Sequence, residues 1–146
     1  MTLAPLTFLD SSVLIAAHRG QSGERELALA VLKDRSRVFI ASPFLYLETM
    51  PKALYFQRTS EVRFYRIYFD NVRIWINDVE AIVRIARDES ERCGLAALDA
   101  LHVAAAYLAD AEVLLTLERK KRAMHRASLV RVVDLEPEGE SATPQG

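Results

Sequence analysis

Short apolar segments alternate with longer segments of helical character along most of the chain, and this alternation constrains the fold more than any other feature. Apolar side chains recur at helical intervals in the longer segments, and several of these begin with helix-start signals. Strands that alternate with helices indicate a parallel sheet with helices on both faces. The predicted fold class is therefore α/β, with a three-layer α/β/α arrangement and a parallel central sheet of four to five strands. The segments expected to be strands are residues 6–9, 37–41, 72–76, 112–116 and 129–135.

Capping residues mark several of the expected helix ends. Ser42 is followed by proline, which is typical of a cap and the first helical position, and Pro51 inside the same segment predicts a kink or a split. Ser11 or Ser12 is expected to cap the helix that follows the first strand. A later helix is expected to run over residues 77–94, with Asn77 at its start and Gly94 at its end.

The composition fits one folded domain over residues 1–135. The chain has 146 residues, of which 51% are hydrophobic, so it contains enough apolar material for a core. Residues 136–146 are polar and rich in proline, glycine and acid, and are expected to form a disordered tail. The net charge is −1, which gives no electrostatic case for bulk binding to nucleic acid or to an acidic membrane.

Cysteine content and hydropathy predict a cytoplasmic protein. Cys93 is the only cysteine, so an internal disulfide is excluded and a reducing compartment is the simplest interpretation. The first ten residues lack the basic start and long apolar middle of a signal peptide. Charged residues interrupt the longest apolar region, over residues 95–115, which argues against a membrane span.

Four acids interrupt apolar stretches. The first and last of them directly follow expected strands, where ligands bind in open α/β sheets. A single acid in such a place could cap a helix or pair with a base, but four separate buried ion pairs would stabilise the fold little. One shared divalent cation would offset the cost of all four, because carboxylate oxygens are natural ligands of Mg²⁺ and Mn²⁺. The four acids are Asp10, Glu48, Asp99 and Glu118.

The segments around these acids resemble the motifs of a known family. They are "FLDSSVLIAA" (8–17), "SPFLYLETM" (42–50) and "GLAALDALHVAAAYLADAEVLLTLE" (94–118). Together they resemble the PIN domain, the fold of VapC-type toxins and related ribonucleases, over roughly residues 6–135. The resemblance implies a PIN-like fold and a Mg²⁺- or Mn²⁺-dependent endoribonuclease. It also implies that the four acids bind the metal and that Ser12 and Thr116 are the small hydroxyl residues beside it.

The implied reaction is hydrolysis of an RNA phosphodiester bond by a metal-activated water. Glu48 or Glu118 could accept the proton of that water, and the sequence does not choose between them. Glu118 departs from the family pattern, in which the fourth acid is usually aspartate. His102 shares a helix face with Asp99, and packing within the helix is its simpler interpretation.

Two further segments suggest partners. Basic residues directly follow Glu118 and could contact RNA phosphates or simply form a solvated helix face. Residues 44–69 hold eight of the twelve aromatic residues, more than one buried face needs. In toxins of the resembled family this region contributes to dimer and antitoxin contacts, so a homodimer and a small antitoxin protein are the expected partners. The basic residues are Arg119, Lys120, Lys121 and Arg122.

Two alternative functions remain open. A PIN-like chain with a compromised site could bind RNA or protein without cutting, and Glu118 favours this alternative. A phosphotransfer protein of receiver or dehalogenase type also places an aspartate after its first strand, although Ser12 stands where dehalogenase-type phosphatases usually have a second aspartate. No P-loop or GxGxxG motif is present, which argues against a nucleotide-binding enzyme.

Overall fold

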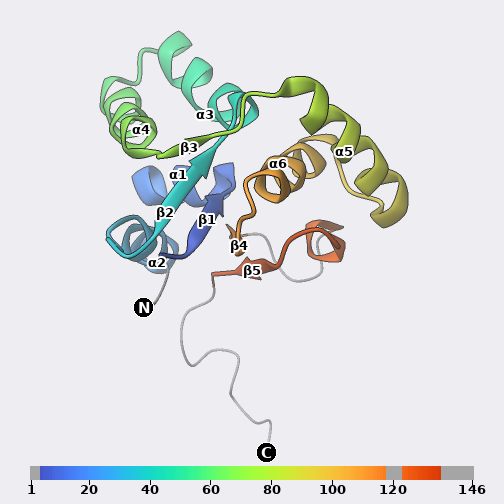
Figure 1. Ribbon diagram of the computed structural model, residues 1–146. Coiled ribbons are helices and arrows are strands. Elements are labelled where there is room, and N and C mark those ends of the chain that lie inside the picture. The colour runs from blue at the N-terminus through green and yellow to red at the C-terminus, as the bar shows by residue number, and fades with distance from the viewer. Residues whose placement is uncertain (1–3, 118–122, 136–146) are drawn as a thin grey trace, which may run out of the picture.

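A parallel β-sheet forms the centre of the protein, seen here in a computed structural model that describes residues 4–117 and 123–135 (Figure 1). Within the described residues the sheet has five strands, in the spatial order β3-β2-β1-β4-β5. Every neighbouring pair is parallel, which confirms the predicted fold class. The strands are β1 (Leu6–Leu9), β2 (Val38–Ala41), β3 (Ile74–Trp75), β4 (Val113–Thr116) and β5 (Val132–Asp134).

Helices cover the sheet on both sides. Pairs of helices connect β1 to β2, β2 to β3 and β3 to β4, and a 3₁₀ turn, η1 (Ala123–Arg126), precedes β5. Both α1 and α6 pack against β1 and β4, and Figure 1 shows them on opposite sides of these central strands. The helices are α1 (Ser11–Arg19), α2 (Ser22–Leu32), α3 (Pro43–Tyr55), α4 (Thr59–Asn71), α5 (Val79–Cys93) and α6 (Ala97–Leu108).

The central strands supply the middle of the core. Phe8, Ile40 and Leu114 have no exposed surface, as expected for strands buried on both faces. Opposite them, α6 contributes a run of buried small side chains at residues 103–106. These small side chains let the helix lie close to β1 and β4, so residues on α6 can reach the edge of the sheet.

Two of the predicted helix caps are wrong. Asp10, and not Ser11 or Ser12, caps α1, and its carboxylate accepts a hydrogen bond from the backbone N–H of Ser12. The helix therefore begins at Ser11, one residue earlier than a Ser11 cap predicts and two residues earlier than a Ser12 cap predicts. Asp78 replaces Asn77 as the cap of α5, because its carboxylate accepts a hydrogen bond from the backbone N–H of Ala81, the third residue of the helix.

Other predicted helix ends are confirmed. Ser42 caps α3, with Pro43 at the first helical position. Gly94 ends α5 at a φ of +68°, the left-handed conformation that glycine adopts without strain. Pro51 lies inside α3 but does not split it, since the helix continues to Tyr55.

The order of the strands creates a point where the chain connections diverge. From β1 the chain passes to β2 on one side of it, and β4 is added later on its other side. Ligands of open α/β sheets bind outside the carboxyl ends of strands at such a point. Asp10 directly follows β1, and Thr116 is the last residue of β4. The fold therefore brings two predicted site residues to the edge where a ligand is expected.

Candidate active site

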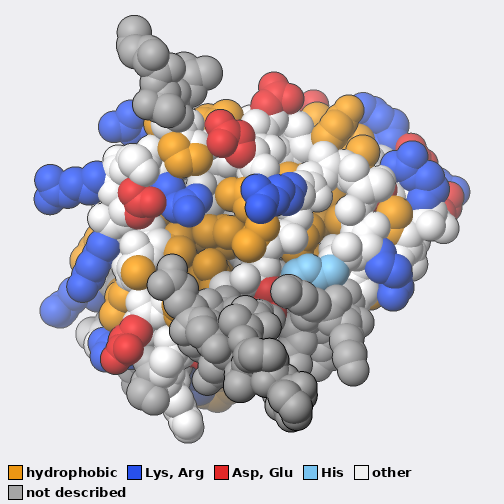
Figure 2. All heavy atoms as spheres, turned by 90° about the horizontal axis from the view of Figure 1, so that it is seen from below, with side chains coloured by type: hydrophobic (Ala, Val, Ile, Leu, Met, Phe, Trp, Pro, Cys, Tyr) orange, Lys and Arg blue, Asp and Glu red, His pale blue; other side chains and the backbone are white. Residues whose placement is uncertain are grey.

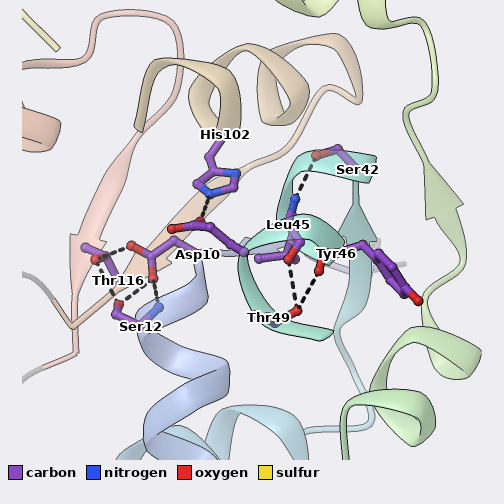
Figure 3. A network of polar contacts seen from close by, with 9 residues as sticks. Asp10, Ser12, Ser42, Leu45, Tyr46, Thr49, His102 and Thr116 are labelled. Atoms are coloured by element: carbon purple, nitrogen blue, oxygen red, sulfur yellow. Dashed lines mark hydrogen bonds and ion pairs between the residues drawn. The ribbon is translucent and has the colours of Figure 1, made fainter. Parts of the chain in front are cut away.

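The carboxylate of Asp10 is held by hydroxyl groups from two elements (Figure 3). The Thr116 hydroxyl donates to its Oδ2 at 2.7 Å, and the Ser12 hydroxyl and backbone N–H donate to its Oδ1. The Ser12 hydroxyl in turn accepts from the backbone N–H of Leu117 at 3.0 Å. The ends of β1 and β4 and the first turn of α1 are thus joined through one buried carboxylate.

A second carboxylate, that of Glu48, is bound to a histidine. Oε1 of Glu48 on α3 lies 2.5 Å from Nε2 of His102 on α6. The Ser11 hydroxyl, adjacent to Asp10, also bonds to Glu48. His102 is 1% exposed, and its ring lies against that of Phe8 in β1, with 5.6 Å between ring centroids.

The charges of these groups influence one another. Burial raises the pKa of Asp10, and the hydrogen bonds from Ser12 and Thr116 and the nearby charge of His102 counter this only in part. Burial also raises the pKa of Glu48, but its hydrogen bond and charge interaction with His102 outweigh burial and hold that pKa below its usual value. Because His102 acts on both carboxyl groups, Asp10 and Glu48 belong to one electrostatic site.

Comparison with family models gives a match over residues 7–133 to the model described as the PIN domain. The chain belongs to the PIN domain family. Members of this family are nucleases, so a nuclease is the broad class to which this PIN domain points. Comparison with curated proteins gives no match.

Solved structures share the fold of this PIN domain at low sequence identity. VapBC2 from Rickettsia felis, bound to a promoter DNA fragment, has a TM-score of 0.68 at 14% identity, covering 90% of this chain and 99% of that one. DNA-bound VapBC from Salmonella typhimurium has a TM-score of 0.65 at 16% identity, covering 90% of this chain and 98% of that one. A toxin–antitoxin complex from Klebsiella pneumoniae has a TM-score of 0.63 at 21% identity, covering 79% of this chain and 88% of that one.

The structure brings some of the predicted site residues of the PIN domain together. Asp10, Ser12 and Thr116 form one hydrogen-bonded cluster, and the Glu48–His102 pair is beside it. Asp99 lies in the first turn of α6, one turn before His102. The remaining predicted site residues, Glu118, Arg119, Lys120, Lys121 and Arg122, lie outside the described residues.

The donor set around Asp10 fits the chemistry of a hard divalent cation. Within residues 4–117 and 123–135 no three His, Cys, Asp or Glu side chains are grouped as a ready-made metal cluster. Mg²⁺, however, usually retains several waters and is bound by one or two protein carboxylates together with substrate phosphates. Asp10 and Glu48 can supply those two carboxylates. The raised pKa of Asp10 also indicates an unfavourable buried charge that a cation would stabilise.

His102 is the site residue that the sequence did not identify as such. It packs in the core as predicted, yet its ring also reaches Glu48, 54 positions away in the sequence. The three-residue spacing from Asp99 on one helix face was the available signal. That spacing could not indicate the partner, because the contact depends on how α3 and α6 lie relative to each other.

The surface around the PIN domain carries mixed charge and exposed apolar side chains. Figure 2 shows basic and acidic side chains around an apolar hollow on one face of the molecule, in keeping with the net charge of −1. In the described part of the chain, no helix is long and apolar enough to span a membrane. Large apolar side chains reach solvent on α3 and α4, where Tyr55 is 80% and Ile67 58% exposed, and Phe56, directly after α3, is 57% exposed.

Proposed function

We propose that this PIN domain is a divalent-metal-dependent endoribonuclease that acts in the cytoplasm as the toxin of a toxin–antitoxin pair. The observation that carries the proposal is the buried Asp10 carboxylate, bonded to Ser12 and Thr116 where β1 and β4 end. A helix cap needs no burial, yet Asp10 is only 4% exposed and lies within the electrostatic reach of His102. This arrangement suits a carboxylate kept in place for a cation.

The residues of the chain divide the work of phosphodiester hydrolysis. Asp10 and Glu48 would hold the cation, with Asp99 and Glu118 as further acids of the set. A bound Mg²⁺ or Mn²⁺ supplies an activated water and stabilises the charge that develops on the phosphate. Ser12 and Thr116 fix both oxygens of Asp10, so this side chain does not have to reorganise when substrate binds.

Glu48 is better suited to hold a cation than to take a proton. Its pKa is lowered by His102, so it remains ionised at neutral pH and is a weak base. The lowered pKa of Glu48 therefore favours Glu118 as the proton acceptor, of the two that the sequence left open. If Glu118 contacts the cation directly, Glu118→Gln should weaken Mn²⁺ binding nearly as much as Asp10→Asn. If Glu118 contacts the cation through a water, Glu118→Gln should cause a smaller loss of Mn²⁺ affinity.

The partners are proposed from the surface of α3 and α4. Exposed apolar residues there surround a hollow that also contains two arginines, Arg63 and Arg66. An apolar surface with basic residues suits a protein segment that carries apolar and acidic side chains, such as an antitoxin, and part of it could also serve a homodimer. The hollow is lined by Leu54, Gln57, Thr59, Val62, Arg63, Arg66 and Ile67.

Cleavage of a mixed pool of single-stranded RNA tests the catalytic proposal. The purified chain should cut RNA with Mg²⁺ or Mn²⁺ and should stop when EDTA is added. Asp99→Asn should abolish cutting while circular dichroism shows an intact fold. Glu91→Gln, an exposed change on α5, is the matched control and should cut at the wild-type rate. Cutting by the wild-type chain that continues in EDTA would contradict the proposal, and cutting by Asp99→Asn at the wild-type rate would remove Asp99 from the site.

The alternative is a PIN domain that binds RNA or protein without cutting it. The observation that favours it is that the described residues contain no group of three metal-ligating side chains. RNA that binds tightly but stays intact with millimolar Mn²⁺ would support this alternative over the nuclease.

A further inference from the structure

A polar contact joins the two helices that carry Glu48 and Asp99. His102 Nε2 on α6 lies 2.5 Å from Glu48 Oε1 on α3, and the side chain of His102 is almost fully buried. Because the carboxylate accepts, the proton of this bond is on Nε2. The other ring nitrogen, Nδ1, is buried without a hydrogen-bond partner among the described residues. Among the described residues, the ring therefore makes its hydrogen bond to Glu48.

Packing fixes the direction of this ring. His102 lies against Phe8, which has no exposed surface and belongs to β1, the strand that ends at Asp10. Neighbouring positions on α6, from Val103 to Ala106, are buried as well. The ring cannot turn toward solvent without opening the core, so Nε2 is held at one place above the sheet edge.

Glu48 needs such support more than Asp10 does. Asp10 is short, follows directly after a strand and has donors on both oxygens. Glu48 has a longer side chain with one more rotatable bond, and it is only half-buried on α3. A side chain of this kind loses conformational entropy when it binds a cation, unless another group has already fixed it.

We propose that His102 is a positioning residue that holds the Glu48 carboxylate in the orientation required for cation binding beside Asp10. It contacts neither substrate nor metal, and it acts through Glu48. This inference rests on the proposed metal-dependent nuclease function. Groups that orient metal ligands in this way typically contribute ten- to a hundred-fold to metal affinity.

Three variants of the purified full chain test this role by electron paramagnetic resonance of Mn²⁺, which measures free metal without any RNA. His102→Phe keeps an aromatic ring against Phe8 and removes the donor. His102→Gln keeps a donor near the place of Nε2. Val103→Ala, on the same helix, weakens packing without touching Glu48 and controls for a general loss of stability. His102→Asn, which is too short to reach Glu48, replaces the phenylalanine variant if that one does not fold.

We expect His102→Phe to bind Mn²⁺ about ten- to a hundred-fold more weakly than the wild type. His102→Gln should regain most of the lost affinity, and Val103→Ala should bind Mn²⁺ with wild-type affinity. A folded His102→Phe protein that binds Mn²⁺ like the wild type overturns the inference and leaves the nuclease proposal standing. Equal losses in the phenylalanine and glutamine variants overturn it too, because packing alone would then explain them. A wild-type chain that binds no Mn²⁺ overturns the proposed metal site and this inference with it.

Discussion

The hydroxyl of Thr116 donates a 2.7 Å hydrogen bond to Oδ2 of Asp10, a residue 106 positions earlier in the chain. This bond joins the ends of two adjacent parallel strands at a buried carboxylate. It stabilises the charged form of Asp10, but burial opposes it and prevails, so the pKa of Asp10 lies above its usual value. The metal-free protein is therefore expected to be under electrostatic stress at this point.

Asp10→Asn should stabilise the metal-free protein at pH 8. The wild-type carboxylate is harder to ionise when folded than when unfolded, so it destabilises the fold at pH values above its unfolded pKa. The advantage of the asparagine variant should shrink as the pH falls through the raised folded pKa toward the unfolded value of 3.8, and below that value the carboxyl is neutral in both states. Urea unfolding in EDTA over a series of pH values from 8 down to 4 measures the difference in unfolding free energy. A variant that is less stable than the wild type at pH 8 would show that the hydrogen bonds outweigh burial.

Glu89→Gln should destabilise the protein near neutral pH. Glu89 on α5 is fully buried and accepts hydrogen bonds from the hydroxyl and backbone N–H of Ser128 and from the backbone N–H of Leu129. Burial alone would raise the pKa of Glu89, but these hydrogen bonds outweigh burial and lower that pKa to about 2. We expect a loss of about 1–3 kcal/mol in unfolding free energy, typical of hydrogen bonds to a charged group.

The pH dependence of the Glu89 effect has a definite sign. A lowered carboxyl pKa stabilises the fold above the unfolded value of 4.5, and this stability is lost as the pH falls from there toward 2. The difference in unfolding free energy between the wild type and Glu89→Gln should therefore narrow as the pH falls from 4.5 toward 2. Glu91→Gln, an exposed change two residues away, should shift the unfolding free energy by less than about 0.5 kcal/mol at any of these pH values.

Two tyrosines on α4 should differ in how the loss of the hydroxyl group changes the unfolding free energy. The hydroxyl of Tyr68 is buried and has no hydrogen-bond partner among the described residues, so Tyr68→Phe should be neutral or stabilise by up to about 1 kcal/mol. The hydroxyl of Tyr65 donates to Glu61 at 3.1 Å, so Tyr65→Phe should cost about 1 kcal/mol or more. Thermal unfolding of both variants measures the contrast. Equal losses of stability would mean that the hydroxyl of Tyr68 has a hydrogen-bond partner.

The exposed aromatic residues of α3 should mediate association. Tyr55→Lys is expected to convert a dimer into a monomer of 16.5 kDa at micromolar concentration, because it places a charge in an apolar interface. Tyr107→Lys, at an exposed position on α6, is the matched control and should leave the mass unchanged. Light scattering measures both. A wild-type mass of one chain would rule out the homodimer.

Local sequence patterns predicted most of the fold, because strands and helix ends depend on neighbouring residues. The Ser42–Pro43 start and the Gly94 end are examples. The cap of α1 was missed because Asp10 and Ser11 are both good capping residues, and only the backbone geometry decides which one faces the first turn. Asp10 was still identified as a candidate site residue, since an acid directly after a buried strand stands out.

The contacts within the candidate site could not be predicted in the same way. The Glu48–His102 bond depends on the distance between α3 and α6, which buried small residues on α6 help to set. The sequence shows the excess of aromatic residues in 44–69, but it does not show which of them are buried and which are exposed. Tyr65, Tyr68 and Phe69 are buried, whereas Tyr46, Tyr55 and Phe56 are exposed. That division depends on which side of each helix faces the sheet.

The thermal stability of the wild type and of Asp10→Asn, with and without Mn²⁺, shows most directly whether a cation binds at Asp10. A cation that binds only the folded chain stabilises it by RT ln(1 + [M]/Kd), or about 2.7 kcal/mol at a hundred times Kd. We predict that millimolar Mn²⁺ raises the melting temperature of the wild type and that Asp10→Asn loses most of this rise. An unchanged wild-type melting temperature, or an equal rise in Asp10→Asn, would contradict a cation site at Asp10.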